Sequence, residues 1–154
     1  MNADISQVSA IGGSAPGRFI AGESLPVLSR HVTQRMIDDY AKASGDFNPI
    51  HVDPDFARNG PFGRTIAHGL MTLAFAAQML NAWTNGAFDE SGEIDVTFIA
   101  PVFADDLLEI TGTVEEIFER EGKPAARVRL MCRVGDRQIL AGTAIQPFEP
   151  IRKS

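Results

Sequence analysis

The segment that most constrains the fold is residues 68–85, which read HGLMTLAFAAQMLNAWTN. Apolar residues occupy nearly every face of a helix built from this segment, and Asn85-Gly86 supplies a stop signal at its end. A helix that is apolar all round has no face suited to water, so we expect it to lie inside the protein. The rest of the chain must therefore supply a surface around it.

Segments typical of β-strands provide that surface. Apolar and polar residues alternate in five segments, at residues 25–32, 94–98, 108–117, 126–134 and 138–145. The fourth segment carries Arg127, Arg129 and Arg133 on one face, so that face is expected to meet solvent, or acidic groups of a ligand or partner. One buried helix followed by consecutive antiparallel strands predicts an α+β domain with a sheet folded around the helix.

Size and charge limit the possible functions. A chain of 154 residues fits one domain, and its net charge of −6 argues against a general affinity for nucleic acid or for an anionic membrane. The sequence contains no run of about 20 apolar residues, so no membrane span is predicted.

Residues 1–18 are rich in small residues and proline and show no secretory pattern. They predict a flexible arm before a single domain at 19–150. Cys132 is the single cysteine, so no intrachain disulfide can form, and we expect this residue to be buried. We expect the protein to be cytoplasmic.

A shorter helix leads into a turn-rich segment at residues 46–64. Thr33 is a plausible N-cap, apolar residues recur at helical spacing up to Ala41, and Gly45 is a natural stop. Within the turn-rich segment, Asp53-Pro54 predicts the start of a short helix that ends near Asn59. Long ordered connections in compact domains are often functional, so this segment is the first place to look for a site.

Asp46 and His51 are the residues of that segment best suited to chemistry. On a continuous helix their spacing of five would leave the two side chains about 140° apart. Pro49 disfavours helical geometry at Asn48, and Gly45 lets the chain leave the helix, so we expect a bent loop that returns both side chains to one point. A carboxylate and an imidazole that share one water can take a proton from it and supply one to a substrate.

Addition of water to an alkene also needs an acceptor for the negative charge that develops. A thioester carbonyl conjugated with the double bond is such an acceptor, and its oxygen needs a hydrogen-bond donor. Gly69 lies where the buried helix begins, so its free backbone N–H is a suitable donor that a carbonyl can approach closely.

Two motifs carry a resemblance to a known family. Residues 44–51 read SGDFNPIH, and residues 64–71 read RTIAHGLM. They resemble the signature and the start of the central helix of the MaoC-like, (R)-specific enoyl-CoA hydratases, also called hydratase 2. The resemblance extends over residues 25–148. It implies a hot-dog fold, in which an antiparallel sheet wraps a long helix, and a homodimer with thioester tunnels beside the subunit interface.

The same resemblance implies the reaction and the site. Such enzymes are lyases that add water to a trans-2-enoyl thioester to give an (R)-3-hydroxyacyl thioester, or run the reverse dehydration, on acyl-CoA or acyl carrier protein substrates. Carried over, Asp46 and His51 bind the catalytic water, the Gly69 N–H forms the oxyanion hole, and Asn48 supports the loop. No cofactor is implied. Some relatives carry a serine two turns beyond the glycine, where this chain has Ala76-Ala77-Gln78, so the acyl pocket is not inferred.

Other interpretations stay open. Asp46 and Asn48 could be turn formers, and His51 a structural histidine. His68 is expected to cap or pack at the helix start, and a metal site formed by His68 with Asp46 and His51 is not expected, because the ligand spacing lacks paired positions on one helix. Arg64 could contact a phosphate of the substrate's carrier or be a solvated loop residue. The alternative functions are a hot-dog acyl-thioester hydrolase and a thioester-binding subunit of a heteromeric dehydratase.

Overall fold

The computed structural model of the protein describes residues 19–149. The elements in chain order are β1 (Leu28–His31), α1 (Gln34–Ser44), α2 (Pro49–Val52), α3 (Pro54–Arg58), α4 (Gly69–Trp83), α5 (Ala87–Ser91), β2 (Glu93–Phe98), β3 (Leu107–Arg120), β4 (Lys123–Val134) and β5 (Arg137–Pro147). The predicted arm at residues 1–18 lies outside the described residues, so the division into an arm and a domain stays a prediction.

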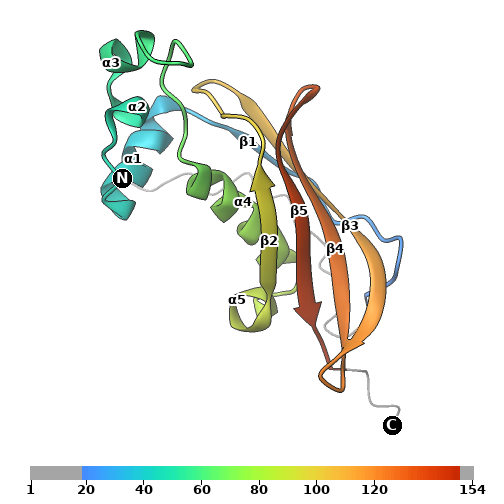
Figure 1. Cartoon of the computed structure of the whole chain (residues 1–154). Helices are drawn as coiled ribbons and strands as arrows, with labels where there is room; N and C mark the ends of the chain where they lie inside the picture. Colours follow the sequence, from blue (N-terminus) through green and yellow to red (C-terminus); the bar gives the residue numbers. More distant parts are fainter. Residues whose placement is uncertain (1–18, 150–154) are drawn as a thin grey trace.

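The five strands form one antiparallel sheet in the order β1-β3-β4-β5-β2. The sheet is curved, and α4 lies along one of its faces, while α1, α2 and α3 gather near the N-terminal end of α4 (Figure 1). The predicted α+β class and hot-dog arrangement are confirmed. Each predicted strand is present, and β1 is shorter than the segment predicted for it, whereas β3, β4 and β5 are longer.

The core lies between α4 and the sheet. Met79, Leu80 and Trp83 of α4 are almost fully buried in one cluster with strand residues such as Ile110. Gly112 of β3 permits this close packing, because a Cβ built there would lie 3.3 Å from the Met79 Cε and 2.9 Å from a Leu25 methyl carbon. The core therefore fixes α4 against the sheet along its length.

The expectation that α4 is buried on every face is wrong within the single chain. Leu70 is 62% exposed, and Ala74, Gln78 and Ala82 follow it along an exposed stripe of the helix. One five-stranded sheet covers only one side of a helix, so the opposite side of α4 stays open.

Among residues 19–149, none of the helices combines the length and the hydropathy that a membrane span requires.

The arginines of β4 stay outside the core, as their alternation predicts. Arg127 contacts Glu116, and Arg129 lies 3.7 Å from Glu115 of the neighbouring strand β3. Their acidic partners are thus residues of the same sheet. Cys132, on the other face of β4, is fully buried as expected.

Candidate active site

The end of α1 directs the chain into the site. Thr33 caps the helix by accepting a hydrogen bond from the Met36 N–H at 3.2 Å, and Gly45 ends it with a positive φ of 77°. Glycine adopts this left-handed conformation at little cost. The Ser44 hydroxyl then accepts a hydrogen bond from the Asp46 N–H at 3.2 Å. This turn places Asp46 just beyond the helix.

The next residues form a single helical turn, α2. Asn48 precedes it in a non-helical conformation, and its side-chain oxygen accepts a hydrogen bond from the Ile50 N–H at 3.2 Å. The prediction that His51 lies on a loop is wrong, because Pro49 occupies the first helical position, where proline's missing N–H costs nothing. The bent path between Asp46 and His51 is present all the same.

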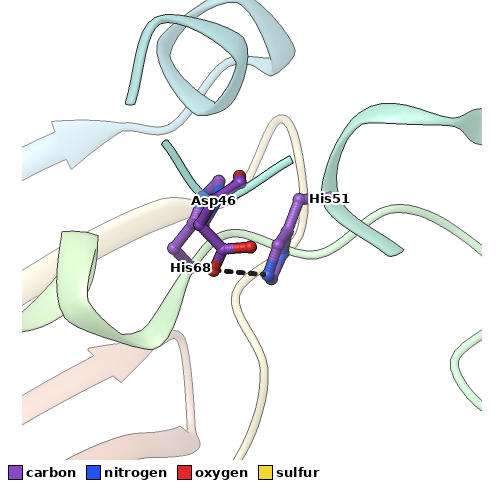
Figure 2. A group of neighbouring side chains, drawn as sticks. All are labelled: Asp46, His51 and His68. Atoms are coloured by element: carbon purple, nitrogen blue, oxygen red, sulfur yellow. Dashed lines mark hydrogen bonds and ion pairs between the residues drawn. The ribbon is translucent and has the colours of Figure 1, made fainter. Parts of the chain in front are cut away.

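Asp46 and His51 converge. The Asp46 Oδ2 and the His51 Nε2 are 3.9 Å apart, which is too long for a direct hydrogen bond (Figure 2). The other ring nitrogen, Nδ1, lies 2.8 Å from the carbonyl oxygen of Ile66. Since a carbonyl only accepts, Nδ1 carries the proton of the neutral ring, and the Nε2 lone pair faces the carboxylate. The imidazole is buried, whereas the Asp46 side chain is half exposed.

His68 completes the cluster as a packing residue. It precedes α4 without making a side-chain capping hydrogen bond. Its Nε2 donates to the Asp46 carbonyl oxygen at 2.9 Å, and its ring stacks on His51 with centroids 3.8 Å apart. Tyr40 contacts the ring as well, at a centroid distance of 4.8 Å. The sequence indicated a capping or packing role, and the structure places His68 in the second.

The three side chains approach each other closely without forming a good metal geometry. Ligand atoms of Asp46, His51 and His68 lie within 4.8 Å of one another. Imidazole lone pairs lie in the ring plane, however, and these two planes are only 26° from parallel, so the lone pairs do not point to one nearby centre. Each ring also uses one nitrogen to donate to a backbone carbonyl.

Gly69 lies between the polar cluster and an apolar cavity. It is the first residue of α4, and within residues 19–149 its N–H finds no protein acceptor. On one side is a cavity of about 210 Å³, lined by Tyr40, Ser44, Asp46, His51, His68, Gly69 and Leu70. On the other is a cavity of about 310 Å³, lined by apolar residues including Phe62, Ile66, Phe98, Val102 and Ile139. A Cβ at Gly69 would lie 3.3 Å from the Phe98 ring, so a side chain there would narrow this junction.

Arg64 is not drawn into the polar cavity. Its guanidinium lies over the Phe103 ring at 4.0 Å from the centroid, and the residue is exposed. Two further groups that hold the site were not indicated by the sequence. One is the Ile66 carbonyl, which any residue type would supply, and the other is Gln34, which occupies an ordinary helix-surface position.

A curved antiparallel sheet packed on one helix defines a hot-dog protein, and this one carries a carboxylate and an imidazole close together at the N-terminus of that helix. The chain belongs to the MaoC like domain family, which it matches over residues 19–131. It is 32% identical to the 3-hydroxybutyryl-CoA dehydratase of Methylorubrum extorquens over 119 residues, 77% of this chain and 74% of that one. It is 34% identical to the (R)-specific enoyl-CoA hydratase of Aeromonas caviae over 99 residues, 64% of this chain and 72% of that one. The solved structure of the (R)-hydratase from A. caviae superposes with a TM-score of 0.73 at 26% identity, over 86% of this chain and 98% of that one.

Proposed function

We propose that this protein is a hydro-lyase that adds water to a trans-2-enoyl thioester to give an (R)-3-hydroxyacyl thioester, or catalyses the reverse dehydration. The observation that carries the proposal is the 3.9 Å separation of the Asp46 Oδ2 and the His51 Nε2 beside the first amide of α4. The names of the matched relatives, a 3-hydroxybutyryl-CoA dehydratase and an (R)-specific enoyl-CoA hydratase, support this class and this stereochemistry.

The Asp46–His51 pair is suited to hold one water. Both facing atoms are acceptors, because His51 keeps its proton on Nδ1 and the Asp46 carboxylate carries no hydrogen when ionised. A water between them donates one hydrogen to each and turns a lone pair toward the β-carbon of the substrate. The pair then takes one proton from the water and returns one to the α-carbon, so the enzyme ends each cycle unchanged.

The Gly69 N–H is suited to bind the thioester carbonyl. Attack at the β-carbon moves the double-bond electrons toward the carbonyl oxygen, and a donor at the start of α4 stabilises that oxyanion. One such donor contributes about 3 kcal/mol to the transition state. The absence of a side chain at Gly69 leaves room for the carbonyl beside the Phe98 ring.

Asn48 and Arg64 have supporting roles in this proposal. Asn48 holds the turn that carries His51 through its bond to the Ile50 N–H. Arg64, exposed and stacked on Phe103, is proposed to bind a phosphate of the carrier, either CoA or acyl carrier protein.

We further propose that the protein acts as a homodimer in the cytoplasm. The exposed stripe of α4 carries the apolar residues Leu70, Ala74 and Ala82 beside one polar residue, Gln78, and Phe98 and Ile99 at the end of β2 are about half exposed. The outer edge of β2 has no partner strand within residues 19–149 and offers a surface for a second copy. A reducing compartment fits the single unpaired cysteine.

Absorbance of the conjugated enoyl thioester tests the function. Purified protein should consume trans-2-enoyl-CoA thioesters without releasing free thiol, and chiral analysis should find the (R)-product. Asp46→Ala and His51→Ala should each abolish turnover. His31→Ala and Asp55→Ala, which remove an exposed histidine and an exposed carboxylate elsewhere, are matched controls. Full activity of both site variants, or release of free thiol in place of hydration, would exclude the proposed roles.

A further inference from the structure

Gln34, in the first turn of α1, connects three separate segments near the site. Its side-chain Nε2 donates to the carbonyl oxygen of His51 at 2.8 Å and to the Asp38 Oδ1 at 2.9 Å. Its Oε1 accepts a hydrogen bond from the Thr65 hydroxyl at 2.6 Å. The amide nitrogen thus has two protein acceptors, and the amide oxygen has one protein donor.

The chemistry of these partners requires glutamine. The His51 carbonyl and the Asp38 carboxylate are both acceptors, so only the NH₂ end of the amide can face them. The Oε1 must then face Thr65, whose hydroxyl supplies the proton. A glutamate of the same shape would direct an acceptor at two acceptors, and a lysine could not accept from Thr65.

Gln34 forms a bridge between His51 and Thr65, and both ends of this bridge help to position the His51 imidazole. One end holds the backbone of His51 itself. The other holds Thr65, and the next residue, Ile66, accepts the His51 Nδ1–H at 2.8 Å and donates its N–H to the Ile50 carbonyl at 3.2 Å. Thr65 and His51 are 7% and 9% exposed, so water competes poorly for these bonds.

We propose that Gln34 and Thr65 are positioning residues that fix the His51 imidazole relative to the N-terminus of α4. Thr65 lies four residues before Gly69, so the bridge sets the spacing between the proposed base and the proposed oxyanion donor. Neither residue lines the polar cavity, and both act through His51. The inference rests on the proposed hydratase function.

Three variants test this bridge through turnover. Gln34→Glu keeps the size but loses the donor, and Thr65→Val keeps the shape but loses the hydroxyl. We expect each to lower kcat about 10- to 100-fold, with KM within about twofold, because small misplacements of a catalytic group carry penalties of this size. Thr65→Ser restores the hydroxyl and should restore kcat. Arg35→Ala, at the neighbouring exposed position of α1, is the matched control and should leave kcat unchanged.

A double variant and a proton resonance separate the possible outcomes. Gln34→Glu with Thr65→Val should lose less than the product of the single losses, because both break one bridge. The His51 Nδ1–H proton, held by Ile66, should exchange slowly by NMR in the wild type and faster in both single variants. An inactive wild type would refute the hydratase function, while this resonance would still test the bridge. Wild-type kcat and unchanged exchange in both variants would overturn the inference.

Discussion

The imidazole rings of His51 and His68 lie stacked, with centroids 3.8 Å apart and planes 26° apart (Figure 2). His68 also donates its Nε2–H to the carbonyl oxygen of Asp46 at 2.9 Å. One side chain therefore contacts both members of the proposed catalytic pair, the ring of one and the backbone of the other. His68 belongs to the segment that begins α4, so it ties the pair to the helix that carries Gly69.

Substitution of His68 should separate its two contacts. His68→Gln keeps a donor for the Asp46 carbonyl but loses the stack, and His68→Phe keeps a ring against His51 but loses the donor. We expect each to lower kcat about tenfold and His68→Ala to lower it further, since placement of both groups loosens. The free energy of unfolding should fall by about 1 kcal/mol for the lost hydrogen bond. Steady-state kinetics measures kcat, and denaturant titration measures the free energy of unfolding. A wild-type kcat in His68→Ala would contradict the prediction.

Gly69→Ala should impair turnover without destabilising the protein. The added methyl would lie 3.3 Å from the Phe98 ring and at the position where a carbonyl must approach the N–H. Because Phe98 is 48% exposed, its ring can shift to admit the methyl group, so the free energy of unfolding should change little. We expect kcat/KM to fall about tenfold or more, as for the loss of an oxyanion donor.

Phe98→Ala offers the control for that crowding. Phe98 is 48% exposed, so its removal leaves much of the structure intact. Because it gives the new methyl group space, the Gly69→Ala, Phe98→Ala double variant should recover part of the activity lost by Gly69→Ala. Equal activity of Gly69→Ala and the wild type would show that no substrate group approaches this amide.

Asn48→Ala should weaken the turn that carries His51. The Asn48 side chain accepts from the Ile50 N–H, and loss of an N-cap of this kind costs about 1 kcal/mol. We expect lower thermal stability together with a lower kcat. Asn48→Asp retains the acceptor and should recover most of the stability. If Asn48→Asp is as unstable as Asn48→Ala, the cap is not what supports this turn.

Much of the fold was predictable because local signals agreed with it. Thr33 and Gly45 bracket α1 by capping chemistry that depends on neighbours in the sequence. The strands follow from alternation, and α4 follows from an apolar segment of helical length. The failure at α2 arose because Pro49 both disfavours a helix before it and permits one after it, and the sequence alone does not decide between them.

The sequence predicted the Asp46–His51 pair, together with Asn48 and Gly69, but not the contacts that hold the pair in place. Gly45 and Pro49 showed that the chain must bend between those residues. The stack of His51 on His68 joins residues that are far apart in sequence, and the bond to the Ile66 carbonyl uses a group that every residue possesses. Gln34 shows no pattern of its own, because its role depends on the placement of Thr65. Such contacts depend on tertiary packing, which local sequence patterns do not encode.

The Cys132 thiol should be unreactive in the folded protein and should couple stability to alkaline pH. Burial raises the pKa of this thiol from 9.0 to about 12. The folded state thus holds the proton more tightly than the unfolded state, so the stabilisation is complete below pH 9 and is lost as the pH rises toward 12. Unfolding titrations should show a smaller decline over this range in Cys132→Ala. Rapid reaction of the native protein with an aromatic disulfide reagent near neutral pH would contradict the burial.

Arg64→Ala should reveal whether the carrier's phosphates are bound. We expect KM to rise about tenfold for an enoyl-CoA, the size of a lost hydrogen bond between charged groups, and to stay unchanged for the matching N-acetylcysteamine thioester, which has no phosphate. Arg64→Lys should recover only part of the affinity, because lysine keeps the charge but not the planar group that stacks on Phe103. Arg58→Ala, which removes an exposed arginine paired with Asp55, is the matched control. An equal rise in KM for both thioesters would show that Arg64 acts on the acyl end of the substrate or on the fold, and an unchanged KM for both would remove Arg64 from the binding site.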